Sequence, residues 1–123
     1  MYRLMLPLAL LLTACGSEEG DGDGDDFDDA TLEAEAWEAI DGYQDWGQVD
    51  PWIGVQPSGR AHGAFVQNWF NTIAEDNHGS TIPDGGIAVK ENYDTADQAE
   101  PNAIFVMHKV EGYDPDNGDW FYA

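Results

Sequence analysis

The chain has 123 residues, of which 42% are hydrophobic, and its 25 acidic residues face only four basic ones, giving a formal net charge of −21 at pH 7. A surface of this sign repels nucleic acid and anionic lipid head groups, so both are excluded as partners. The length fits one domain. Cys15 is the single cysteine, so no internal disulfide can form.

The first residues have the three parts of a secretory signal. Met1 to Arg3 form a short basic start, and Leu4 to Leu12 are almost wholly apolar, with Pro7 inside the run. A membrane-spanning helix needs roughly 20 apolar residues, so this run is too short to remain as a transmembrane segment. We therefore expect residues 1–14 to be a signal peptide.

The end of that segment, Leu12-Thr13-Ala14-Cys15, resembles the lipobox of bacterial lipoproteins. The resemblance implies cleavage before Cys15, acylation of Cys15 with chains such as palmitate, and a membrane contact made through lipid. It also implies the cell envelope, and Gly16 after the cysteine favours the outer membrane, facing the periplasm or the cell surface. The alternative is an ordinary signal peptide that happens to contain a cysteine.

An acidic stretch follows the cysteine, and Phe27 is its only large apolar residue. We expect residues 15–30 to be a disordered linker, because so few apolar groups cannot offset the entropy of ordering. Asp21 to Asp25 alternate with glycines as in some calcium loops, but no bidentate glutamate follows at the required distance. A soluble, extended tether is the simpler interpretation.

Beyond the linker, the pattern changes from helix to strands. Apolar residues at three- and four-residue spacing predict a helix from Thr31, capped within Asp28 to Thr31. A loop rich in proline and glycine should follow over residues 49–59. The helix positions that carry this spacing are Leu32, Ala36, Ile40 and Tyr43, with Gly42 or Gly47 ending the helix.

Strand-like runs occupy the second half of the chain. They are His62 to Phe70, Gly86 to Tyr93, Ala103 to Val110 and Trp120 to Tyr122, with a short helix over Asn68 to Glu75 as an alternative for part of the first. Apolar residues occupy both faces from Ala103 to Met107, which predicts that this run is the central strand. The short loops favour an α+β fold, an antiparallel β-sheet packed against one or two helices. The expected core is Ile87, Val89, Ile104, Phe105, Val106 and Trp120 against Trp37 and Ile40.

Three blocks, in the order Ile82 to Glu91, Val106 to Pro115 and Gly118 to Tyr122, resemble the cytochrome P-460 family, whose fold the cytochromes c′-beta share. The resemblance makes residues 31–123 a P-460-like domain. It implies an antiparallel sheet with flanking helices, commonly a homodimer, that holds a c-type haem against the sheet. Members of the family are linked to hydroxylamine oxidation or nitric oxide binding.

Lys90 matches the lysine that is bonded to the haem macrocycle in cytochrome P-460 proper, so the resemblance makes it the candidate cofactor-binding residue. Strand alternation places Lys90 on the less apolar face. The alternative is a solvated lysine that pairs with some of the many carboxylates.

The chain departs from the family where the haem is attached. The family uses a Cys-x-x-Cys-His motif beyond the block at Trp120, and these 123 residues contain none. We therefore expect no haem in the chain as given, a C-terminally incomplete domain and no catalysis. Either the chain is the front part of a longer protein or it is a member without the haem segment.

Other site chemistry is sparse. His62, His78 and His108 lack the spacing of a zinc site, so no metal site is predicted. Asp114 to Asp119 resembles the start of a calcium loop, but a hairpin turn explains it more simply. Two function classes remain: a redox or gas-binding cytochrome domain with a redox partner, and a haem-free lipoprotein that binds a small ligand or a partner.

Overall fold

The computed structural model describes residues 27–59 and 63–123, which form an antiparallel sheet with helices beside it. The expected α+β class is therefore confirmed. Cys15, the predicted signal peptide, the linker up to residue 26, and His62 lie outside the described residues. Within the described ranges, no helix has the length and apolar character needed to cross a membrane.

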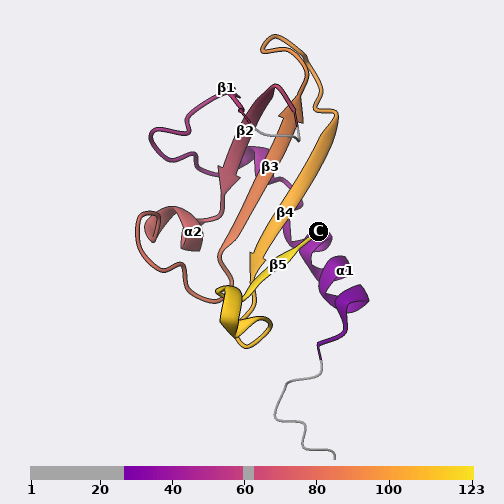
Figure 1. Ribbon diagram of the computed structural model, residues 1–123, viewed down its shortest axis with the longest axis vertical. Helices are drawn as coiled ribbons and strands as arrows, with labels where there is room; N and C mark the ends of the chain where they lie inside the picture. Colours follow the sequence, from indigo (N-terminus) through magenta and orange to yellow (C-terminus); the bar gives the residue numbers. More distant parts are fainter. Residues whose placement is uncertain (1–26, 60–62) are drawn as a thin grey trace, which may run out of the picture.

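The five strands lie in the sheet in the same order as in the sequence, each antiparallel to its neighbours. In Figure 1, α1 and the turn after it pass behind this sheet, and α2 lies beside one end of β2. Two 3-10 turns, Tyr43–Asp45 and Pro115–Asn117, precede β1 and β5. The elements are α1 (Asp29–Ala39), β1 (Gln56–Pro57), β2 (Phe65–Phe70), α2 (Thr72–Asp76), β3 (Ile87–Tyr93), β4 (Ala103–Lys109) and β5 (Trp120–Tyr122).

Helix α1 begins where a side chain can cap it. The Asp28 carboxylate accepts a hydrogen bond from the Thr31 backbone N–H at 3.2 Å, satisfying one of the free donors of the first turn. The cap confirms the prediction from sequence, although the helix starts at Asp29, inside the predicted linker. Gly42, at φ +73°, takes the left-handed conformation just past the helix end.

Asn71 connects α2 to the sheet. Its side-chain oxygen accepts hydrogen bonds from the backbone N–H groups of Ala74 in α2 and Ile87 in β3, both at 3.0 Å. Its amide nitrogen donates to the Gly85 carbonyl at 2.9 Å. The short helix weighed as an alternative for Asn68 to Glu75 thus exists, but only from Thr72 onward.

The central strand is β3 and not β4, so that prediction was wrong. β3 pairs through six residues with β2 on one side and through six with β4 on the other. β4 has β5 as its outer neighbour, and their register covers only three pairs. The apolar residues on both faces of β4 misled the prediction because one of these faces is not buried: Phe105 is 38% exposed.

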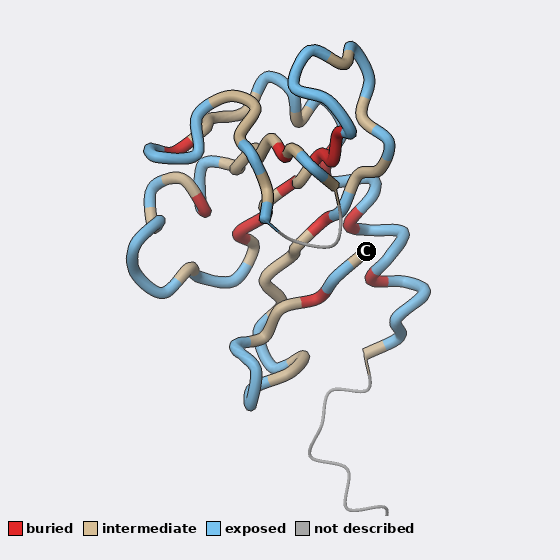
Figure 2. The backbone as a smooth tube through the Cα atoms, turned by 45° about the horizontal axis from the view of Figure 1, so that its top comes forward, coloured by how far each residue is buried: buried red, intermediate tan, exposed pale blue. Residues whose placement is uncertain are grey.

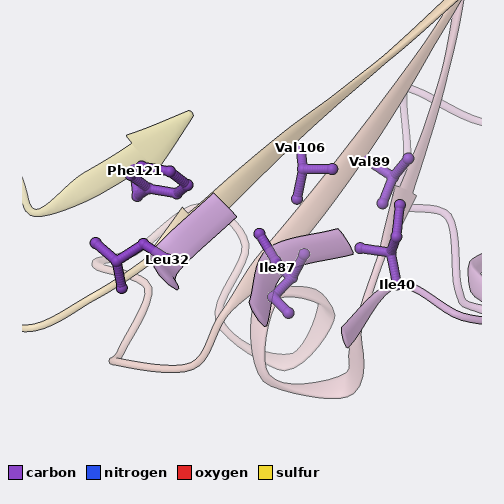
Figure 3. Packing of buried hydrophobic residues seen from close by; sticks show 7 residues of the cluster. Leu32, Ile40, Ile87, Val89, Val106 and Phe121 are labelled. Carbon is purple, nitrogen blue, oxygen red and sulfur yellow. The ribbon is translucent and has the colours of Figure 1, made fainter. Parts of the chain in front are cut away.

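The hydrophobic core lies between α1 and one face of the sheet. Figure 3 shows strand side chains directed toward Leu32 and Ile40, and Figure 2 shows buried positions recurring along the strands while most loops are exposed. Phe121 takes the place expected for Trp120, because successive strand residues point to opposite faces. The core residues are Leu32, Ala36, Ile40, Ile87, Val89, Val106 and Phe121, with Ile104 packed against them.

Three residues of the expected core lie outside this cluster. Phe105 and Trp120 alternate with the core-facing Val106 and Phe121, so they belong to the other face of the sheet. Trp37 follows the buried Ala36 and is displaced around the helix toward solvent. The prediction that these three aromatic residues belong to the core was wrong, because strand alternation directs Phe105 and Trp120 to the other face and helix geometry directs Trp37 toward solvent.

Replacing Val106 with alanine should lower the free energy of unfolding by about 2 kcal/mol, because Val106 is fully buried and the substitution leaves a cavity. Denaturant titration measures this loss. Ile53→Ala is the matched control, since Ile53 is largely exposed and should lose less than half as much. Equal losses of stability in both variants would show that Val106 does not belong to the core.

Candidate functional site

The face of the sheet opposite α1 is the candidate functional site, and we call it the open face. Directly paired residues of neighbouring strands share a face. Val89 and Val106 pair on the α1 side, so the pairs Ala88 with Met107 and Lys90 with Phe105 project from the other. By this register, the open face carries Val66, Asn68, Phe70, Ala88, Lys90, Phe105, Met107, Lys109, Trp120 and Tyr122.

Three adjacent hollows lie on the open face. The Trp120 hollow, about 260 Å³, has Ala88 and Met107 in its lining. The Pro57 hollow, also about 260 Å³, shares Trp52 and Asn68 with it. The Tyr122 hollow, about 220 Å³, shares Met107 with the Trp120 hollow and Lys90 with the Pro57 hollow. The shared walls make the three hollows one continuous surface.

Aromatic side chains surround these hollows and remain accessible. Tyr122 is 65% exposed, Trp52 is 50% exposed, and Phe105 has more than a third of its surface exposed. Trp52 reaches the hollows from the loop before β1, within the loop predicted over residues 49–59. Grouped apolar exposure of this kind marks interaction surfaces more often than isolated exposed residues do.

Lys90 lies where the open face is hollowed. It is half-buried in β3 and lines both the Pro57 hollow and the Tyr122 hollow. Its Nζ atom lies 5.9 Å from the centre of the Phe105 ring, within the range of a cation–π contact. Its match to a haem-linked lysine stays a prediction.

Neither of the described histidines belongs to the open face, where Lys90 lies. His108 pairs with the core residues Ile87 and Phe121, which places it on the α1 side of the sheet. Burial lowers the pKa of His108, and Asp84 and Glu35 oppose that shift only in part. His78 is exposed after α2, and its Nδ1 lies 2.6 Å from the Glu75 carbonyl oxygen. Among the described residues, no three potential metal ligands converge.

No protein-family model, curated protein or solved structure matches the chain. The likeness to the cytochrome P-460 family therefore rests on the three sequence blocks alone.

A buried carboxylate lies beside the core, and it was not among the predicted site residues. Glu91 is 2% exposed, and its two carboxylate oxygens accept hydrogen bonds from the hydroxyls of Tyr43 at 2.6 Å and Tyr93 at 2.5 Å. The Gln44 amide adds a longer bond at 3.4 Å. Strand alternation puts Glu91 on the same face as Ile87 and Val89, and an acid among apolar residues needs hydrogen-bond partners, so this position was the available signal in the sequence.

The network changes the proton affinity of all three groups. Burial by itself raises the pKa of Glu91, but the hydrogen bonds from Tyr43 and Tyr93 outweigh it and bring that pKa below its usual value. Desolvation and the neighbouring Glu91 charge raise the pKa of Tyr43 to about 12, and they raise the pKa of Tyr93 as well. Glu91 is therefore ionised at neutral pH, with two protonated tyrosines as donors.

Glu91→Gln should reduce stability at neutral pH by about 1–3 kcal/mol, because a charge-assisted pair of hydrogen bonds is lost in a buried place. The pKa of Glu91 is lower in the folded chain than in the unfolded one. The stability that the Glu91 carboxylate contributes is therefore complete above pH 4.5, the ordinary pKa of the group. It disappears as the pH falls through the lowered pKa of the folded chain.

Urea titrations across the acidic range measure this dependence as the difference between wild type and variant. The difference should shrink below about pH 4.5, the ordinary value. Glu33→Gln is the control, because Glu33 is exposed, and its stability should equal that of the wild type across the same pH range. A difference that stays constant down to pH 2 would contradict ionisation of Glu91 as its cause.

Proposed function

We propose that this chain is a lipid-anchored protein of the bacterial cell envelope whose P-460-like domain binds a small, flat aromatic ligand on the open face. The observation that supports this most is the continuous set of aromatic-lined hollows opposite α1. Helix α1 covers one face of the sheet, while exposed Trp52, Phe105 and Tyr122 flank the other.

The size of the hollows indicates the shape of the ligand. Pockets for small molecules usually measure about 300–1,000 Å³. Each hollow is slightly smaller, at 220 to 260 Å³, but the hollows adjoin through Met107, Asn68 and Lys90. A flat molecule that lies across two of them would contact several aromatic rings at once, and offset or edge contacts with each ring add about 0.5–1.5 kcal/mol.

The residues present do not fit the family's c-type haem. Thioether attachment requires two cysteines, and the chain has only Cys15, outside the domain. An axial ligand from His108 would have to come from the α1 side of the sheet, whereas Lys90 is on the open face. The haem-free alternative from sequence analysis is thus the function that the geometry supports better, and we assign no redox chemistry to these residues.

Trp52→Ala should weaken the binding of a neutral aromatic probe, N-phenyl-1-naphthylamine, by about tenfold, because the indole lines two of the three hollows. Fluorescence titration of the probe measures the affinity. Trp37→Ala is the matched control: it removes an indole that is 40% exposed, against 50% for Trp52, from α1 on the opposite side, and should change the affinity less than twofold. Equal losses in both variants, or no binding to wild type, would contradict the proposal.

Cys15→Ser should release the protein from membranes, because several acyl chains on one residue are what make lipid attachment stable. Membrane fractionation with immunodetection measures the change. Mass spectrometry of the wild type should find an acylated Cys15 at the N-terminus. An unmodified Cys15, or residues 1–14 still attached in the envelope fraction, would overturn the anchoring proposal.

A further inference from the structure

Both described lysines lie on the open face. Lys90 pairs with Phe105 and Lys109 with Trp120, and both pairs project away from α1. The rest of the described chain supplies acidic residues and no other lysine or arginine. In a chain with a net charge of −21, this placement gives the apolar face the opposite charge to the remainder of the surface.

Within the described ranges, each ammonium group lies over an aromatic ring. Lys90 Nζ lies 5.9 Å from the Phe105 ring centre, and Lys109 Nζ lies 5.1 Å from that of Trp120. No ion pair joins either lysine to an acidic residue described by the structure. The alternative raised from sequence, a lysine paired with the abundant carboxylates, is thus not what the structure has at Lys90.

The two lysines differ in their surroundings. Lys90 lines the Pro57 and Tyr122 hollows, whose other lining residues, among those that the structure describes, are aromatic, apolar or uncharged polar. Lys109 lines none of the three hollows of the site. It borders a fourth depression, which shares Ile82 with the Trp120 hollow and is lined by three carboxylates, those of Asp84, Glu111 and Asp119. A negative group on a ligand would therefore meet a favourable field at Lys90 and a mixed one at Lys109.

We propose that the ligand of the open face is an aromatic organic anion, bound with its charged group at Lys90 and its ring system over Met107 in the adjoining hollows. This inference rests on the proposed function, because it specifies the chemistry of the molecule that occupies the same hollows. A small anion with one charge fits better than a polyanion, since the acidic surface repels each additional negative charge.

The test compares two probes of the same size, 2-naphthoate and the neutral 2-naphthamide, by isothermal titration calorimetry on the full chain. Lys90→Met should weaken 2-naphthoate binding about fivefold more than it weakens 2-naphthamide binding, as expected for a partly exposed charge pair. Lys90→Arg, which keeps the charge, should restore most of the difference. Lys109→Met is the matched control on the same face and should alter the ratio of the two affinities less than twofold.

Thermal melts monitored by circular dichroism confirm that each variant is folded, and Lys90→Gln replaces Lys90→Met if the latter is not. Equal losses for both probes in Lys90→Met would overturn the anion inference and leave the binding proposal intact. A larger effect of Lys109→Met than of Lys90→Met would overturn it too. If the wild type binds neither probe, the proposed function fails together with the inference.

Discussion

The packing of α1 on the sheet decides the arrangement of nearly everything else. Val89 and Val106 are paired across β3 and β4 and fully buried beneath the helix, so the strands cannot slip by one residue without exposing both. The same constraint fixes the opposite face. Once the two valines point toward α1, the neighbouring Lys90 and Phe105 must point away from it.

The open face is thus a consequence of a sheet that has a substantial helix on only one side. The loop before β1 reaches part of it through Trp52, but the outer part of β4 has only the three-residue β5 beside it. Trp52, Phe105, Trp120 and Tyr122 line hollows that share lining residues, and both lysines of the described residues project from the same face.

Local patterns in the sequence predicted the elements better than they predicted the core. Capping at Asp28, the turn before β5 and the alternation in β3 depend on neighbouring residues, and these elements lie where they were expected. The central strand could not be predicted from β4 alone, because a run that is apolar on both faces can line an accessible surface as well as a buried layer.

The size of an aromatic side chain does not show whether it belongs to the core. Trp120 and Phe105 are large enough to belong to a core, yet their strand positions assign them to the other face. Lys90 could be placed on the correct face by alternation, but the hollows around it depend on Trp52 and Tyr122, which are distant in sequence. The partners of Glu91 were equally hidden, since Tyr43 lies 48 residues away.

Asn71 has a consequence for the order in which the domain is assembled. Helix α2 has only five residues, too few to be stable in isolation, and its first turn is capped by a side chain that also binds the first residue of β3. We therefore expect the helix to form together with the pairing of β2 and β3. The amide hydrogens of Ala74 and Ile87 share one acceptor, so they should exchange with solvent in the same opening event. Hydrogen exchange in this five-residue helix would then also measure the opening of the pairing between β2 and β3.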